Sequence, residues 1–443
     1  MLIKEKTKDI ILVLAIILIG FLFLSYFKIK HQMTFTNLDE LLWMYRSRFF
    51  MDGILSGDFS NLIQSSQPGI MAMWLIGPFM KIVSYDFMSI SNFIADLNNS
   101  GIPYNIINGN DQQIYADYKE LSFLLNIPIF GVIIFFTFSL YYLLKKLSFS
   151  KWAIFFSLLL IVTTPYYIYF TTPTDKLVGI FSTLSILSLL VYAGNKGGKK
   201  FLFASAILCS WAVLTKISAL FLVPFSLLVL AFYKLNYCFL KSLKPQASSL
   251  KNIIKDCFFW LITFLTTSII FLPTIITDPR SILNFFTKES SKRIITESPV
   301  SYDPFLNFKI ILAYLSDSFL LSFNLFVMAV FIAFICLLIQ KTKRKIEIDK
   351  RVVILIIYCL SFFLFVTLFS KTYSFRYLVP ALIIFQIAAG IGIYEFSSII
   401  AEKNKTINKN ITYLFTVIFI LLSQALLIYY SAIEKIEELP YFG

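Results

Sequence analysis

Charged residues are scarce in this sequence. Only 14% of its 443 residues are Asp, Glu, Lys or Arg, whereas 58% are hydrophobic. A soluble protein averages about 25% charged residues, so this chain has too little charge to cover a water-facing surface of its size. The composition therefore excludes an ordinary soluble protein and favours a helical bundle in lipid.

Histidine, cysteine and nucleotide-binding motifs are also rare or missing. His31 is the only histidine, which excludes a metal site built from several histidines. The five cysteines lie scattered in apolar segments without a CxxC pair, so we interpret them as small core residues. The sequence contains no P-loop and no GxGxxG motif. The sequence has no soluble domain on which the net charge of +14 could form a basic surface, which argues against nucleic-acid binding.

Long apolar runs make up most of the chain. A membrane-spanning helix needs about 20 mostly apolar residues, so we predict an all-α polytopic membrane protein with about eleven spans. The fifth and sixth spans are short and poorly separated. The predicted spans lie near residues 9–27, 121–144, 151–170, 175–193, 201–215, 217–233, 256–277, 318–340, 352–370, 377–399 and 410–430.

Basic residues indicate the orientation. With the N-terminus in the cytoplasm, the short inner loops hold more than half of the 39 Lys and Arg residues, as the positive-inside rule requires. No A-x-A cleavage site follows the first apolar run, so we interpret that run as an uncleaved span. The abundance of Ile, Lys, Asn and Phe hints at an AT-rich bacterial genome, so we expect a multi-pass protein of a bacterial cytoplasmic membrane.

Two long segments then lie outside, at 28–120 and 278–317, and the remaining C-terminal helices fall within 318–443. We treat residues 1–443 as one transmembrane module. The first outer loop, 28–120, contains two stretches with helical apolar spacing, DELLWMYRSRFFMDGIL and PGIMAMWLIGPFMKIV. We expect both to be helices that lie in the membrane interface.

An acidic pair, Asp39 and Glu40, begins the first of these stretches. One interpretation is a general base with a supporting carboxylate, because a carboxylate beside the membrane surface can take a proton from an attacking hydroxyl. The other is an ordinary N-cap and first-turn acid pair, stabilised by the helix dipole. A divalent cation held by this pair and a substrate phosphate is chemically compatible, although no spacing in the sequence requires one.

Further charges are predicted at the outer ends of distant spans. Asp175 is a second candidate site acid, or simply a helix-start residue after Pro173. Lys216, Arg280 and Arg376 are candidates for binding a lipid-linked phosphate, or they extend to lipid headgroups at helix ends. Their origin in three distant segments on one predicted face favours the phosphate site.

The run NLDELLWMYRSRFFMDGILSGDFSNLIQSSQPGIMAMWL resembles the first outer loop of the polyprenyl-phosphate-dependent glycosyltransferases of the GT-C fold, such as protein O-mannosyltransferases and lipid A aminoarabinose transferases. That family pattern has an acidic pair, a helix with aromatic residues and Arg, a Gly-Asp turn and a His-Pro-Gly or variant. TPTDKLVGIFSTLSIL, LTKISALFLVP, FLPTIITDPRSIL and FRYLVPALIIF resemble its later landmarks, in the expected order.

The resemblance implies a GT-C-type bundle and a role for each matching residue. Asp39 matches the catalytic base and Glu40 is its neighbour. Asp175, Arg46 and Gln67 fall in the sugar or acceptor pocket, and Gln67 replaces the His of many relatives. Lys216 and Arg376 match positions near the donor phosphate, and Arg280 is a third candidate cation for it from its charge and predicted position.

The function so implied is an inverting glycosyltransferase. It would move a hexose or pentose from a polyprenyl phosphate to a hydroxyl or amine of a lipid, glycan or protein acceptor at the outer face, among membrane lipids. The main alternative is a transporter or flippase of a lipid-linked glycan, which would favour charges at the membrane midplane and repeated halves. A polymerase or ligase of the other GT-C branch would have its main outer loop late in the chain.

Overall fold

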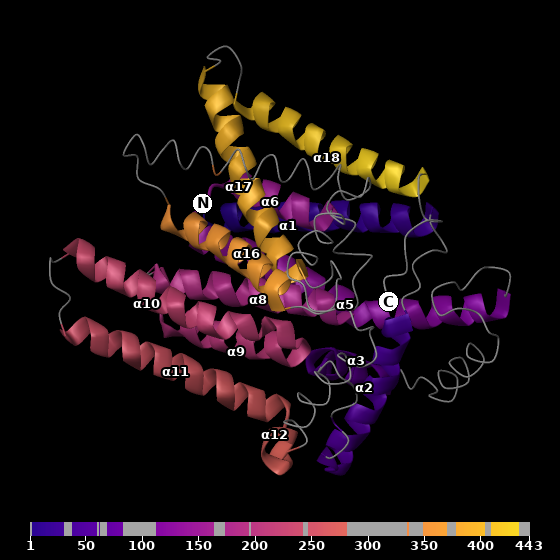
Figure 1. Ribbon diagram of the computed structural model, residues 1–443. Coiled ribbons are helices and arrows are strands. Elements are labelled where there is room, and N and C mark those ends of the chain that lie inside the picture. Colours follow the sequence, from indigo (N-terminus) through magenta and orange to yellow (C-terminus); the bar gives the residue numbers. More distant parts are fainter. Residues whose placement is uncertain are drawn as a thin grey trace. The chain divides into compact units, whose positions relative to one another are not determined.

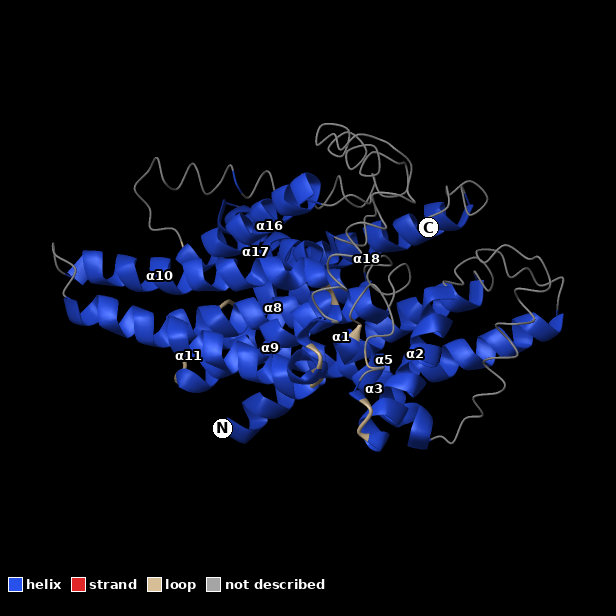
Figure 2. Cartoon of the chain, turned by 60° about the horizontal axis from the view of Figure 1, so that its bottom comes forward, coloured by secondary structure: helices blue, strands red, loops and turns tan. Residues whose placement is uncertain are grey.

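The computed structural model describes residues 2–30, 38–59, 62, 69–82, 112–163, 173–194, 196–241, 247–280, 335, 349–369, 378–403 and 409–433. All elements assigned within these ranges are helices, and no strand occurs among them (Figures 1 and 2). Every predicted span except 318–340, which falls almost entirely outside the described ranges, overlaps one of these helices.

The helices are α1 (Leu2–Lys30), α2 (Leu38–Ser56), α3 (Ile70–Ile82), α5 (Gln112–Lys146), α6 (Lys151–Thr163), α8 (Pro173–Ala193), α9 (Lys199–Thr215), the 3₁₀-helix η2 (Ile217–Phe221), α10 (Leu222–Lys241), α11 (Ala247–Phe271), α12 (Thr274–Thr277), α16 (Lys350–Phe369), α17 (Val379–Lys403) and α18 (Lys409–Ile433).

Four described helical segments are long and apolar enough to cross a membrane. They are Ile127–Lys146 in α5, Pro173–Ala193 in α8, Lys251–Phe271 in α11 and Val379–Glu402 in α17. Further apolar helices, such as Asp9–Leu22 in α1, are shorter within the described ranges. The protein is thus a membrane protein whose described part is all helical, while the number of about eleven spans remains a prediction.

The chain forms two compact units. Unit 1 consists of Met1–Gln32, Phe136–Phe170 and Pro304–Gly443, and unit 2 of Met33–Phe135 and Thr171–Asp303. Helix α5 begins in unit 2 and ends in unit 1. One transferase module over 1–443 stays a prediction.

Unit 1 is built around the crossing of α6 and α17. Its apolar core includes Phe156 of α6, Ile393 of α17 and Tyr413 of α18. The crossing is close because α17 has Gly390 at the contact, where an added Cβ would overlap the backbone nitrogen and hydroxyl of Ser157. The Ser157 hydroxyl donates to the carbonyl of Ile387 at 3.1 Å, so a small residue and an interhelical hydrogen bond hold the two helices together.

One end of unit 1 is held by two groups of ionic contacts. In the first, the carboxylate of Asp9 in α1 accepts a hydrogen bond from the Lys145 ammonium of α5. The Lys151 ammonium of α6 lies 3.5 Å from the other oxygen of the same carboxylate. Asp9 itself is buried, so one carboxylate joins the ends of three helices.

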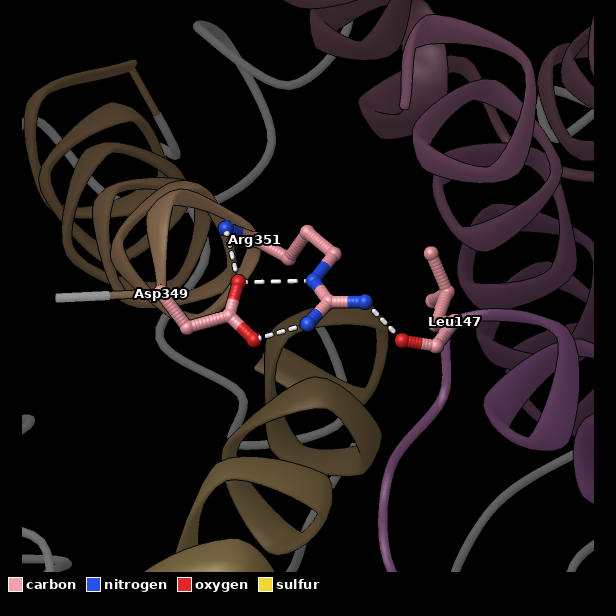
Figure 3. Close-up of polar contacts among 3 residues, drawn as sticks. All are labelled: Leu147, Asp349 and Arg351. Atoms are coloured by element: carbon pink, nitrogen blue, oxygen red, sulfur yellow. Dashed lines mark hydrogen bonds and ion pairs between the residues drawn. The ribbon is translucent and has the colours of Figure 1, made fainter. Parts of the chain in front are cut away.

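The second group joins α16 to the turn between α5 and α6 (Figure 3). Asp349 precedes α16 and accepts hydrogen bonds from the Arg351 backbone N–H at 3.0 Å and from the Arg351 Nε at 2.6 Å. The same guanidinium donates to the carbonyl oxygen of Leu147 and lies 5.2 Å from the ring centroid of Phe149. A single arginine thereby fixes the turn to the start of α16.

Unit 2 is a bundle in which α8 is the central helix, with α9 and α10 against it and α11 against both of these (Figure 1). All described side chains of α8 except Tyr192 are buried, from Pro173 to Ala193. Serines replace apolar residues at the α8–α9 contact, where the Ser185 hydroxyl donates to the Ser205 carbonyl at 2.9 Å. These small polar residues allow the close helix packing that occurs in lipid.

We expect Gly390→Val to destabilise unit 1 by at least ~2 kcal/mol, because overpacking a close contact costs about 1–3 kcal/mol or more. Gly131→Val is the matched control, since a Cβ at Gly131 meets nothing within 4 Å. Thermal unfolding in detergent measures both. Equal unfolding midpoints for the two variants would contradict the assigned helix crossing.

Candidate functional site

The two helices of the first outer loop form a hairpin in unit 2. Both stretches predicted to be helical are helices, α2 and α3. Trp74 of α3 packs edge to face against Phe50 of α2, with ring centroids 5.5 Å apart. Ile70, Met73 and further residues of α3 are buried, so protein covers much of a helix that we expected in the membrane interface. Its apolar spacing arises from packing against α2, α8 and α9.

Three hydrogen bonds attach this hairpin to other segments of unit 2. The Gly69 N–H donates to the carbonyl oxygen of Thr215, the last residue of α9, at 3.0 Å. The Trp74 indole donates to the carbonyl of Phe271 at 3.0 Å, and the Thr274 hydroxyl donates to the carbonyl of Phe59 at 3.0 Å. The first outer loop therefore contacts the end of α9 and the region from the end of α11 to α12, just before the predicted second outer segment, and these parts are predicted to lie on one side of the membrane.

A buried ion pair lies directly after Thr215. The Lys216 ammonium donates a hydrogen bond to the carboxylate of Asp175, and the two side chains are 3% and 1% exposed. Asp175 is in the first turn of α8, which begins with Pro173. Since α8 and α9 are consecutive helices packed along each other, the start of one meets the end of the other.

The backbone is interrupted at Lys216. This residue is extended, with φ −153° and ψ 131°, between the end of α9 and the 3₁₀-helix η2. Helix ends leave their last carbonyl groups without helical partners, and Gly69 supplies one such partner to Thr215. An interrupted helix with a buried charge at the break is typical of binding sites in membrane proteins, because irregular backbone at that depth is tolerated where protein or a water-filled cavity surrounds it.

The energetics of the Asp175–Lys216 pair favour a role beyond stability. Desolvating two charges costs several kcal/mol for each ion, and the attraction between them regains this only with good geometry. An apolar pair of similar volume often stabilises a fold equally well. Charges inside membrane helices are therefore functional candidates by default, and this pair is close to the loop that contains the candidate base.

The other predicted site residues are described to different extents. Asp39 and Glu40 are in the first turn of α2, and the structure describes their backbone there. Arg46, a full two turns after Asp39, lies with its guanidinium 5.0 Å from the ring centroid of Trp43. Arg280 is exposed, shortly after α12. Gln67 and Arg376 lie outside the described residues. The contact of Arg376 with the donor phosphate therefore stays a prediction.

Two features of this region were not predicted from the sequence. Lys176, next to Asp175, is only 4% exposed, so a second lysine is buried at the start of α8. Its position in the TPTDK run, at the start of an apolar span, was the available signal. Gly69 and Trp43 form the second feature, since a Cβ at Gly69 would overlap the Trp43 ring. No local pattern indicates that contact, because Trp43 is in α2 and Gly69 is the residue before α3, far along the chain.

Metal ligands do not cluster in the described part of the chain, where no group of three or more His, Cys, Asp or Glu side chains has a geometry suited to an ion. Comparison with known proteins found no matching family model, no matching curated protein and no matching solved structure. The resemblance to polyprenyl-phosphate-dependent glycosyltransferases therefore depends on the motifs alone.

We expect Lys216→Met to lower the free energy of unfolding by about 3–5 kcal/mol, because it leaves the Asp175 carboxylate buried without its ammonium. The double variant Lys216→Met/Asp175→Leu should recover most of this loss. Denaturant unfolding in detergent measures both.

Lys81→Met is the control, since Lys81 pairs with Asp52 at 2.8 Å with both side chains well exposed. Exposed pairs contribute about 0–1 kcal/mol. If Lys216→Met costs no more than Lys81→Met, the buried pair is wrongly assigned.

Proposed function

We propose that this protein is an inverting glycosyltransferase that moves a sugar from a polyprenyl-phosphate donor to an acceptor hydroxyl or amine at the outer face of the membrane. The observation that best supports the proposal is the buried Asp175–Lys216 pair at the helix break to which Gly69 of the first outer loop is hydrogen-bonded. It joins two of the segments that resemble the family at one place in unit 2.

The donor phosphate would be bound by the cations. Lys216 is the cation at the helix break, and its ammonium would donate to a phosphate oxygen. Arg280 and Arg376 would provide further positive charge, Arg280 from an exposed position after α12. Because Lys216 is held by a buried partner, its charge is oriented before the donor arrives, as preorganised electrostatic stabilisation requires.

The reaction needs one base and one displacement. Asp39 takes the proton of the acceptor group while the acceptor oxygen or nitrogen bonds to the anomeric carbon of the sugar. The bond from that carbon to the phosphate oxygen breaks, and its electron pair remains on the phosphate, where the cations stabilise it. A single displacement from the face opposite the phosphate inverts the anomeric centre. Glu40 supports the base, and Arg46 and Gln67 orient the sugar or the acceptor.

The surrounding architecture that we propose is a GT-C-type bundle with about eleven spans in a bacterial cytoplasmic membrane. Its N-terminus is cytoplasmic and its active site faces outward. The four long apolar helices and the helical first outer loop support this arrangement. The activated donor needs no nucleotide, which agrees with a sequence that lacks nucleotide-binding motifs.

We expect Asp39→Asn to abolish transfer, with a rate reduced at least ~100-fold, because general-base catalysis contributes about 10²–10⁴-fold. Its unfolding midpoint should stay within a degree or so of the wild type. The assay follows the release of polyprenyl phosphate from a panel of polyprenyl-phosphate monosaccharides in proteoliposomes, by mass spectrometry.

Asp52→Asn is the matched control, because Asp52 is on the same helix and its carboxylate is 46% exposed in a surface ion pair. It should retain transfer. Normal turnover by Asp39→Asn would contradict the proposal. Movement of the lipid-linked sugar across the vesicle membrane without any transfer would instead support the transporter alternative.

A further inference from the structure

Gly69 is in contact with two parts of the proposed site at once. It is the residue immediately before α3, with a positive φ of 53°. Its N–H donates to Thr215, next to Lys216, and its carbonyl accepts the N–H of Met73 in the first turn of α3, both at 3.0 Å. The backbone of Gly69 thereby starts one helix and closes the end of another.

The side of Gly69 that has no Cβ is filled by Trp43. A Cβ there would overlap three carbon atoms of the six-membered ring of this tryptophan. Trp43 is only 2% exposed, so its ring is enclosed by other parts of the protein. The guanidinium of Arg46 lies over the same ring, 5.0 Å from its centroid. Arg46, Trp43, Gly69 and Thr215 therefore form a continuous series of contacts from α2 to the end of α9.

We propose that Gly69 and Trp43 are positioning residues, which hold α2, with the proposed base Asp39 and with Arg46, in register with the helix break at Lys216. This inference rests on the proposed function, and it adds residues to which no catalytic or binding role was assigned. Asp39 is one turn before Trp43 on α2, so a displacement of the Trp43 ring moves the backbone that bears the base.

The proposed base and the proposed phosphate-binding cation are held by different contacts, so loosening the Gly69–Trp43 contact should affect them differently. The donor phosphate would be bound by Lys216, whose ammonium is held by Asp175 of α8 and not by the Trp43 ring. The proposed base, Asp39, is on α2, whose position does depend on the contact between Trp43 and Gly69. A displacement of about 1 Å between reacting groups can cost about 10²-fold in rate. Loosening this contact should therefore lower kcat and leave the KM for the donor nearly unchanged.

The test compares two glycines of the same hairpin. Gly69→Ala places a methyl group against Trp43, and we expect kcat to fall about 10–100-fold with the donor KM within about threefold of the wild type. Gly57→Ala is the control, because Gly57 also has a positive φ, 75°, but a Cβ there meets nothing within 4 Å. It adds backbone strain without a collision, so its kcat should remain within about threefold of the wild type. Equal effects of the two variants would overturn the proposal.

A compensating variant separates positioning from folding. In Gly69→Ala/Trp43→Leu the smaller side chain makes room for the methyl group, so we expect kcat to rise at least about threefold above that of Gly69→Ala. The unfolding midpoint of the double variant should fall by less than the sum of the falls in Gly69→Ala and Trp43→Leu. This measurement needs no transferase activity. If the wild type transfers no sugar but the midpoints are non-additive, the proposed function fails and the contact stands. Additive midpoints would overturn the contact itself.

Discussion

The ion pair between Lys216 and Asp175 is the interaction on which the account of the site depends. A lysine ammonium that is 3% exposed needs a partner, and the structure provides one from the start of the neighbouring helix. This places two requirements on the fold: α8 and α9 must pack along each other in one register, and α9 must end at Thr215, directly before Lys216. The buried length of α8 and the serine contacts to α9 meet the first requirement. The extended backbone of Lys216 meets the second.

The position of the first outer loop also depends on the end of α9, next to Lys216. Its two helices pack on each other through Phe50 and Trp74, but the hairpin is attached to the bundle by backbone carbonyl groups at the ends of α9 and α11. Such groups are available only because these helices end there, since carbonyls inside a helix already have partners. The positions of α2, and hence of Asp39 and Arg46, follow from where α9 stops. The Asp175–Lys216 pair is thus connected to α2, which carries the candidate base, through the Gly69–Thr215 hydrogen bond and the contact of Gly69 with Trp43.

Much of the fold could be predicted from the sequence, because apolar runs of the right length have few alternatives to helix in lipid. The helices α2 and α3, and the irregular region near Lys216, are examples. The pairs of residues that contact each other could not be predicted in the same way. Asp175 and Lys216 were separate candidates, and their pairing depends on the register of two packed helices. The contact of Gly69 with Trp43 depends on how the hairpin closes, and the burial of α3 depends on neighbours that its own apolar spacing does not identify.

Binding of the donor lipid tests the central claim most directly. A polyprenyl phosphate without sugar can be titrated against the purified protein and against Lys216→Met/Asp175→Leu, with native mass spectrometry to count bound lipid and thermal unfolding to verify the fold. We predict a saturable site in the wild type and at least a tenfold weaker affinity in the folded double variant, because the proposed phosphate site loses its ammonium. Equal affinity of the two folded proteins would contradict the claim that Lys216 of this buried pair binds the donor phosphate.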